Sequence, residues 1–210
     1  MTQFDHLLDG YRRFRDGRYA GEQERWRELA EGQSPVAVVI ACCDSRADPA
    51  TIFDTDPGEI FVVRNVANLV PPFEPGGGRH GVSAALEFAI TQLEIPEIVV
   101  MGHERCGGIA ASLTGKFADA AAGEGGFIAQ WMELLETPRA LIAERYGEGP
   151  EAAMLLEEAG IRQSLANLRT FPFVAEREQT GRLKLHGCHF SIFKGQLYLL
   201  DEAEGLFRPA

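Results

Sequence analysis

The chain has 210 residues, of which 45% are hydrophobic and 24% are charged, and its formal net charge is −11. These values are ordinary for a globular protein, and the length is sufficient for one domain with its own core. An acidic surface repels nucleic acid and anionic membranes, so neither is an expected partner. No apolar run approaches the roughly 20 residues of a membrane helix, and the N-terminus lacks the apolar segment of a signal peptide, so we predict a cytoplasmic protein.

Residues 1–32 are predicted to form an N-terminal helical arm. Apolar side chains recur at helical spacing from Phe4 to Phe14, and a second helix is expected over about 21–31. Gly17 is expected to separate the two helices. The two helices precede the first predicted strand, so they form either an arm or part of the outer layer of the domain.

Three short apolar runs rich in β-branched residues predict strands that are buried on both faces. They cover residues 36–41 (VAVVIA), 60–63 (IFVV) and 98–101 (IVVM). Between the last two, residues 81–93 carry apolar side chains at helical spacing. A strand, a crossover helix and a second strand imply a parallel sheet.

The second half of the chain is predicted to be mainly helical and to end in a hairpin. A small, glycine-rich loop is expected over 118–126, helices over 127–135, 140–146 and 151–168, and strands over 183–193 and 196–200 around Lys194-Gly195. The predicted fold class is therefore α/β, with a central, mainly parallel sheet that has an antiparallel edge strand and is flanked by helices. We expect a single domain over residues 1–210.

Four side chains with metal-binding chemistry follow two of the predicted strands. Cys42 and Asp44 follow the first strand, and His103 and Cys106 follow the strand near Met101. Ligands of open α/β sheets bind at the carboxyl ends of the strands, so these side chains converge if the two strands are neighbours. Two thiolates, an imidazole and a carboxylate are suitable ligands for zinc.

Arg46 argues against a closed structural zinc site. An arginine two residues after Asp44 is able to hold its carboxylate in a bidentate pair, which takes Asp44 off the metal. Zinc then keeps three protein ligands and one open position for water, which is the arrangement of catalytic zinc.

The remaining cysteines and polar residues near these motifs have simpler interpretations. We interpret Cys43 and Cys188 as small core residues, and His186 and His189 as structural residues of a strand. His80 is interpreted as a surface histidine, and Glu104 and Arg105 as solvent or interface residues.

These motifs resemble those of the β-class carbonic anhydrases. CxDSR at Cys42–Arg46 and GHxxCGG at Gly102–Gly108 are similar to the two signatures of that family, and VRNVAN at Val63–Asn68 is similar to a third. The resemblance is continuous from about Gln33 to Ile109 and looser toward the C-terminus. It implies the reversible hydration of carbon dioxide to bicarbonate and a proton by zinc-bound hydroxide.

The resemblance also implies the roles of individual residues. Cys42, His103 and Cys106 bind Zn²⁺, and Asp44, held by Arg46, accepts a hydrogen bond from the zinc-bound water or hydroxide. Substrate-binding roles fall on the Gln33 side chain, the Gly107 amide and an apolar wall of Phe61, Val66 and Phe88. The family forms homodimers, in which the partner supplies part of that wall, and some dimers pair into homotetramers.

One branch of the family closes its site by ligating this aspartate to zinc and binds regulatory bicarbonate with a tryptophan and a tyrosine. Val39 and Phe190 occupy those two positions here. We therefore predict an open site at neutral pH, with water as the fourth ligand.

Two other functions remain open from the sequence. The first is hydrolysis of carbon disulfide or carbonyl sulfide on the same scaffold, which parallel substrate assays distinguish. The second is a non-enzymatic, zinc-stabilised domain, which exchangeable water on the metal excludes.

Overall fold

The computed structural model describes residues 2–76 and 78–210, and contacts within the chain divide it into two units that meet between Ser34 and Pro35. The first unit contains α1 (Gln3–Phe14), a π-helical turn (Arg15–Tyr19) and α2 (Gln23–Glu31). Both predicted helices are present, but the expected break at Gly17 is wrong. The helical backbone continues through Gly17, since a glycine inside a helix weakens it without ending it.

Local interactions define the two helices of the first unit. Thr2 and Asp5 form a reciprocal capping box at the start of α1, in which each side chain accepts a hydrogen bond from the other residue's backbone N–H. Phe14, Tyr19 and Trp26 form an aromatic cluster with ring centroids 5.4–6.1 Å apart. None of the helical residues of this unit is fully buried, so the aromatic cluster and the backbone hydrogen bonds from the Glu22 N–H to Arg18 and Tyr19 join α1 to α2.

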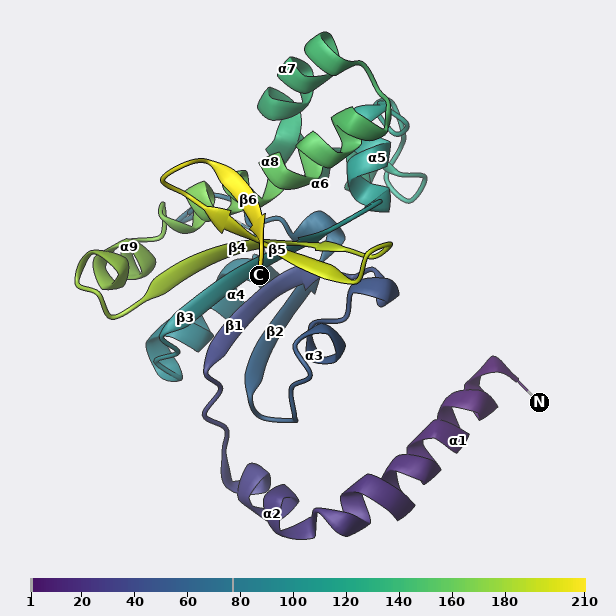
Figure 1. Ribbon diagram of the computed structural model, residues 1–210, viewed down its shortest axis with the longest axis vertical. Coiled ribbons are helices and arrows are strands. Elements are labelled where there is room, and N and C mark those ends of the chain that lie inside the picture. Colours follow the sequence, from purple (N-terminus) through teal and green to yellow (C-terminus); the bar gives the residue numbers. More distant parts are fainter. Residues whose placement is uncertain (1, 77) are drawn as a thin grey trace. The chain divides into compact units, whose positions relative to one another are not determined.

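The second unit is built on a six-stranded sheet with the order β2-β1-β3-β4-β5-β6, which Figure 1 shows at the centre of this unit. The strands are β1 (Ala37–Cys42), β2 (Ile60–Asn65), β3 (Glu97–His103), β4 (Lys184–Ser191), β5 (Gln196–Asp201) and β6 (Leu206–Pro209). The first four pair in parallel, and β5 and β6 add antiparallel strands at one edge. The predicted fold class is confirmed, although β6 was not foreseen because its four residues carry no alternating pattern.

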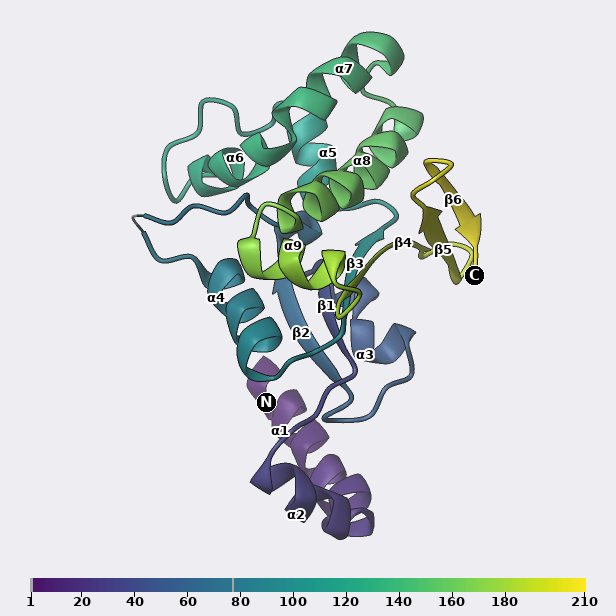
Figure 2. The ribbon, with the colours of Figure 1, turned by 90° about the vertical axis from the view of Figure 1, so that its left-hand side faces the viewer.

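Helices cover both faces of this sheet and its carboxyl end. They are α3 (Pro49–Ile52), α4 (Gly81–Glu87) with a π-helical turn (Phe88–Gln92), α5 (Gly107–Leu113), α6 (Gly126–Met132), α7 (Glu136–Tyr146), α8 (Pro150–Leu168) and α9 (Pro172–Gln179). Figure 2 shows α4 on one side of the sheet and α3 on the other. Among the described residues, no helix combines the length and the apolar character that crossing a membrane requires.

Helix α8 packs closely on β3 and β4 because two glycines make room for it. A Cβ atom on Gly102 would lie 2.8 Å from Ile161 Cδ1, and one on Gly187 would lie 2.9 Å from Ile161 Cγ2. Ile161 is fully buried, and burial of such a side chain stabilises a fold by about 1.5–3 kcal/mol. The two glycines therefore set how closely α8 approaches the carboxyl ends of the strands.

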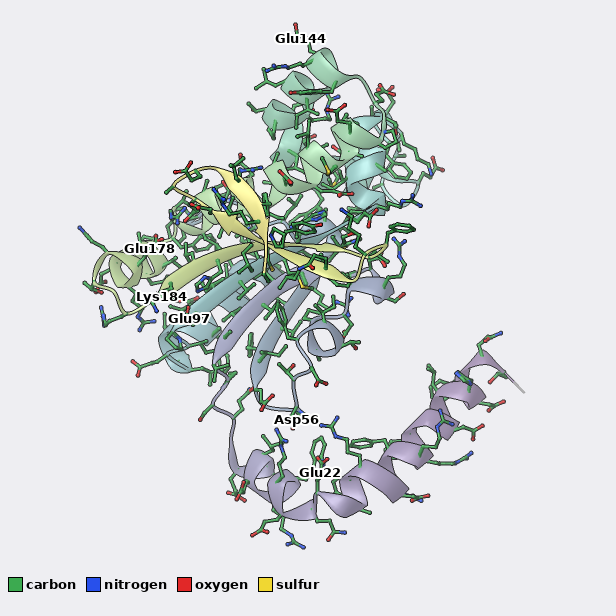
Figure 3. The ribbon with its side chains drawn as sticks, viewed as in Figure 1. Glu22, Asp56, Glu97, Glu144, Glu178 and Lys184 are labelled. Atoms are coloured by element: carbon green, nitrogen blue, oxygen red, sulfur yellow. The ribbon has the colours of Figure 1, made fainter. Side chains whose placement is uncertain are left out.

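The amino ends of β3 and β4 are joined by charged side chains. Glu97 lies opposite Lys184 in the strand register, and Glu97 Oε1 is 3.7 Å from Lys184 Nζ. Figure 3 shows the two residues side by side. Glu97 also contacts His186 Nε2 at 2.5 Å. Because all three side chains are partly solvent-accessible, these contacts contribute little to the stability of the fold.

Candidate metal centre

Cys42, His103 and Cys106 meet at the carboxyl ends of β1 and β3. Strand order reverses between these neighbouring strands, because the chain runs from β1 to β2 on one side and then crosses to β3 on the other. All three side chains are buried, and their potential ligand atoms lie within 4.8 Å of one another. The predicted convergence of these residues is present in the structure.

The geometry of this cluster suits a tetrahedral cation. Cys42 Sγ and Cys106 Sγ are 3.9 Å apart, and two sulfurs bound to zinc at about 2.3 Å with a tetrahedral angle are about 3.8 Å apart. His103 Nδ1 lies 3.0 Å from the Glu104 carbonyl oxygen. His103 Nε2 is buried and has no hydrogen-bond partner among the described residues. An imidazole oriented in this way directs its free nitrogen toward a metal.

The two thiols differ in acidity because a hydrogen bond links their sulfurs. This hydrogen bond lowers the pKa of Cys42 despite its burial. The same interaction, together with burial, raises the pKa of Cys106. A cation placed between two sulfurs takes the place of the hydrogen between them, so its binding releases protons.

Asp44 is held beside this cluster by Arg46. Arg46 Nε donates to Asp44 Oδ1 at 3.0 Å and Nη2 donates to Oδ2 at 2.7 Å, and the Arg46 backbone N–H adds a third bond at 3.0 Å. The side-chain hydrogen bonds from Arg46 hold the pKa of Asp44 well below its usual range. Asp44 Oδ2 lies 3.9 Å from His103 Nε2, so the carboxylate is close to the cluster but engaged by the arginine.

Two arginines connect the segments that carry the cluster. Arg46 Nη2 also donates to the carbonyl oxygen of Arg105, beside Cys106, at 3.2 Å. Arg64 donates to the carbonyl oxygens of Cys42 at 2.9 Å and Asp44 at 2.7 Å. We predicted no role for Arg64 at this cluster, although its place in the VRNVAN motif was a signal that could have identified it.

The turn between His103 and Cys106 depends on an unusual backbone conformation. Arg105 has a φ of 56°, in the left-handed region that few residues other than glycine adopt. Gly108 lies two residues after Cys106 and packs against Val66, the residue that follows β2. A Cβ atom on Gly108 would lie 2.7 Å from Val66 Cγ1. The requirement for glycine at Gly108 therefore comes from Val66.

The predicted substrate-binding residues fall into separate groups. Phe61 and Phe88 lie together, with ring centroids 6.2 Å apart. Val66 contacts Gly108, next to Gly107 at the start of α5. Gln33 belongs to the first unit, whereas the cluster belongs to the second, and the contact of Gln33 with substrate stays a prediction.

Several interpretations of the neighbouring residues change. Cys188 is a core residue, and burial raises its pKa to about 12, but Cys43 is exposed and its assignment to the core is wrong. A residue that directly follows an inward-facing ligand on an extended strand faces outward. Glu104 is also more than a solvent residue, since it accepts hydrogen bonds from Ser191 Oγ at 2.9 Å and the Phe193 N–H at 3.0 Å.

Comparison with known proteins places the chain in a family. Residues 37–197 match the family model described as "Carbonic anhydrase". A carbonic anhydrase of Pseudomonas aeruginosa is 37% identical over 203 residues, which cover 96% of this chain and 89% of that protein. A carbonic anhydrase of Synechocystis sp. is 32% identical over 202 residues, covering 93% of this chain and 70% of the relative.

Solved structures agree with the sequence comparison. The β-carbonic anhydrase CcaA matches with a TM-score of 0.90 at 30% identity, over 100% of both chains. A tetrameric β-carbonic anhydrase from Sordaria macrospora matches with a TM-score of 0.82 at 28% identity, over 94% of this chain and 96% of that one. The chain therefore belongs to the β-class carbonic anhydrases, lyases whose general reaction is the hydration of carbon dioxide.

Proposed function

We propose that this chain interconverts carbon dioxide and bicarbonate with a zinc ion held by Cys42, His103 and Cys106. The observation that carries the proposal is His103 Nε2, a buried nitrogen without a hydrogen-bond partner among the described residues, in a cluster whose sulfurs are 3.9 Å apart. Soft sulfur ligands with one imidazole favour zinc over magnesium or calcium. Zinc at such a site supplies a Lewis acid that makes hydroxide available near neutral pH.

Asp44 and Arg46 orient the nucleophile in this proposal. The two hydrogen bonds from Arg46 keep the Asp44 carboxylate ionised and fixed. An ionised carboxylate accepts a hydrogen bond but repels an anion that has no hydrogen to donate. Asp44 would therefore favour an oxygen that carries a hydrogen, such as water or hydroxide, beside the zinc ligands. Its carboxylate would hold that oxygen in the orientation needed for attack on carbon.

The substrate pocket in this proposal combines apolar and polar groups. Phe61, Val66 and Phe88 offer apolar surface to carbon dioxide, which has no net dipole. The roles proposed for the Gly107 N–H and the Gln33 amide are to orient its oxygens. Support for the wall comes from the exposure of Val66 and Phe88, at 37% and 48%, which leaves both side chains accessible to a small molecule.

We also propose that the chain is a single domain that functions as a homodimer, with a homotetramer as the larger alternative. The first unit leaves Phe4, Leu7 and Tyr11 exposed on α1, and an apolar stripe of this kind is typical of a helix that packs on another chain. The Sordaria macrospora relative is tetrameric. A cytoplasmic location is proposed from the sequence, while two Arabidopsis thaliana relatives are named as mitochondrial and chloroplastic.

The test is stopped-flow carbon dioxide hydration with the metal content measured on the same sample. Cys42→Ser is expected to lose zinc and activity together. Asp44→Ala is expected to keep zinc and to lose about 100-fold in turnover, because a misoriented nucleophile is costly. Full activity in Asp44→Ala would contradict its orienting role.

Asp119→Ala is the matched control, since it removes an exposed acid outside the cluster. It should leave zinc content and turnover unchanged. Stoichiometric zinc in the wild-type protein without any hydration activity would identify the site as structural and reject the proposed function.

A further inference from the structure

Glu157 on α8 is the only buried acidic side chain among the residues that the structure describes, with 4% of its surface exposed. It lies on the buried face of the helix, together with the apolar side chains of Leu156 and Ile161. A carboxyl group is costly to bury unless both of its oxygens are hydrogen-bonded. Neither the proposed catalytic steps nor the helix itself uses this group.

Both oxygens of Glu157 have partners behind the metal centre. Glu157 Oε1 accepts a hydrogen bond from the Cys106 backbone N–H at 3.0 Å. Glu157 Oε2 lies 3.0 Å from His189 Nε2, on a buried histidine of β4. The carboxyl group thus joins α8, β4 and the cluster cysteine at a single point.

The Cys106 N–H needs an acceptor from outside its own segment. Cys106 is the N-cap residue of α5, so the helix offers its N–H no acceptor. The left-handed conformation of Arg105 turns the chain immediately before it. Glu157 provides the acceptor, and the distance from Cys106 Sγ to Cys42 Sγ depends on where this N–H is held.

Glu104 holds the other end of the segment between His103 and Cys106. Its carbonyl oxygen contacts His103 Nδ1, and its carboxylate binds Ser191 and Phe193 at the β4–β5 turn. With Glu104 fixing the histidine, the position of the cysteine remains to be fixed. We propose that Glu157, itself held by His189, is a positioning residue that sets the place of Cys106 for metal binding.

This inference rests on the proposed zinc site, and three variants of Glu157 test it. Glu157→Gln keeps an acceptor oxygen for the Cys106 N–H and offers an amide to His189. Glu157→Met has a similar length but no acceptor, and Glu157→Asp is one methylene too short to reach both partners. The measurements are the zinc dissociation constant, by competition with a chromophoric chelator, and the absorption spectrum of the Co²⁺-substituted protein.

We expect Glu157→Met to weaken zinc binding by about 10–100-fold, and Glu157→Asp by about tenfold, as for other groups that orient metal ligands. Both should shift the Co²⁺ absorption bands. Glu157→Gln should retain the wild-type affinity and spectrum. If Glu157→Met does not fold, the comparison of Glu157→Asp with Glu157→Gln decides the question.

Asn167→Leu is the matched control. It removes a buried hydrogen bond of 2.7 Å from the same helix to the Val70 carbonyl oxygen, away from the cluster. It should lower the stability of the protein without changing zinc affinity or the Co²⁺ spectrum. Zinc affinity in Glu157→Met and Glu157→Asp equal to that of Asn167→Leu would overturn the positioning role. Failure of the wild-type protein to bind zinc would instead reject the proposed function, and this inference with it.

Discussion

At the residue scale, the cluster of Cys42, His103 and Cys106 is held by hydrogen bonds to its backbone. Arg64 donates Nε to the Cys42 carbonyl oxygen, Nη2 to the Asp44 carbonyl oxygen and Nη1 to Asp48 Oδ2, at 2.7–2.9 Å. Asp48 in turn caps α3 through the Thr51 N–H. One partly buried guanidinium therefore fixes the segment that presents both Cys42 and Asp44.

Arg64→Lys is expected to lower the free energy of unfolding of the zinc-free protein by about 2 kcal/mol. Lysine keeps the charge, but a single ammonium group does not reach three acceptors arranged around a planar guanidinium. Urea denaturation measures the change. Arg208→Lys is the control, because Arg208 pairs with Asp201 at 3.7 Å on the surface, where the effect should stay below about 0.5 kcal/mol. Equal effects of the two substitutions would contradict the role of Arg64.

At the scale of elements, α8 connects the sheet, the metal centre and the C-terminal hairpin. Its middle packs on β3 and β4 through Ile161, and its C-cap residue Arg169 binds two glutamates from other elements. Arg169 Nη2 lies 2.8 Å from Glu178 on α9 and 2.8 Å from Glu202 in the β5–β6 turn. The guanidinium and its two carboxylates add an ionic link between elements that also pack together in the core, through Leu165, Val174 and Leu200.

Glu202→Gln is expected to destabilise the fold by about 0.5 kcal/mol at pH 7, a small value because the pair is solvent-exposed. The hydrogen bond from Arg169 lowers the pKa of Glu202 from its ordinary 4.5. The carboxylate therefore stabilises the fold above that pH, and its contribution is lost as the pH falls through the lowered pKa. Urea denaturation of both proteins across this acidic range measures their free energies of unfolding. The difference between the two values should fall toward zero as the pH decreases.

Glu204→Gln is the control for this pH dependence. It removes the same charge from the same turn, and Glu204 forms no ion pair with the described part of the chain. Its effect on the free energy of unfolding should be near zero at every pH. A difference between wild type and Glu202→Gln that persists in acid would show that the carboxylate charge is not its source.

At the scale of the whole molecule, the cluster joins distant parts of the second unit. Cys42 and Cys106 are 64 positions apart and belong to β1 and the start of α5. Both sulfurs also lie in an apolar cluster with residues of α6 and α8, including Met132 and Leu156. A cation bound there links strand and helix layers, so its binding free energy adds to the stability of the folded chain.

Zinc is therefore expected to raise the thermal unfolding temperature. A free zinc concentration 100-fold above the dissociation constant stabilises the fold by about 2.7 kcal/mol, or about 5–10 °C for a chain of this size. Thermal unfolding in zinc-buffered solutions measures the shift. Cys42→Ser should show no dependence on zinc over the same range, and an equal shift in that variant would place the metal elsewhere.

The sequence by itself determined the parallel strands of the sheet and the residues of the cluster. Continuous β-branched runs predicted β1, β2 and β3 near their observed bounds, because strands buried on both faces leave no room for polar alternation. The spacing of Cys42, His103 and Cys106 after two such strands predicted their meeting. Tertiary structure alone decided which groups hold them there. Arg64 and Glu157 bind backbone atoms, and the Glu104 carboxylate binds Ser191 and the Phe193 N–H, all of which lie beside them only in the folded chain. A motif can mark such a residue, as it does for Arg64, but the residue pattern does not show which atoms it contacts.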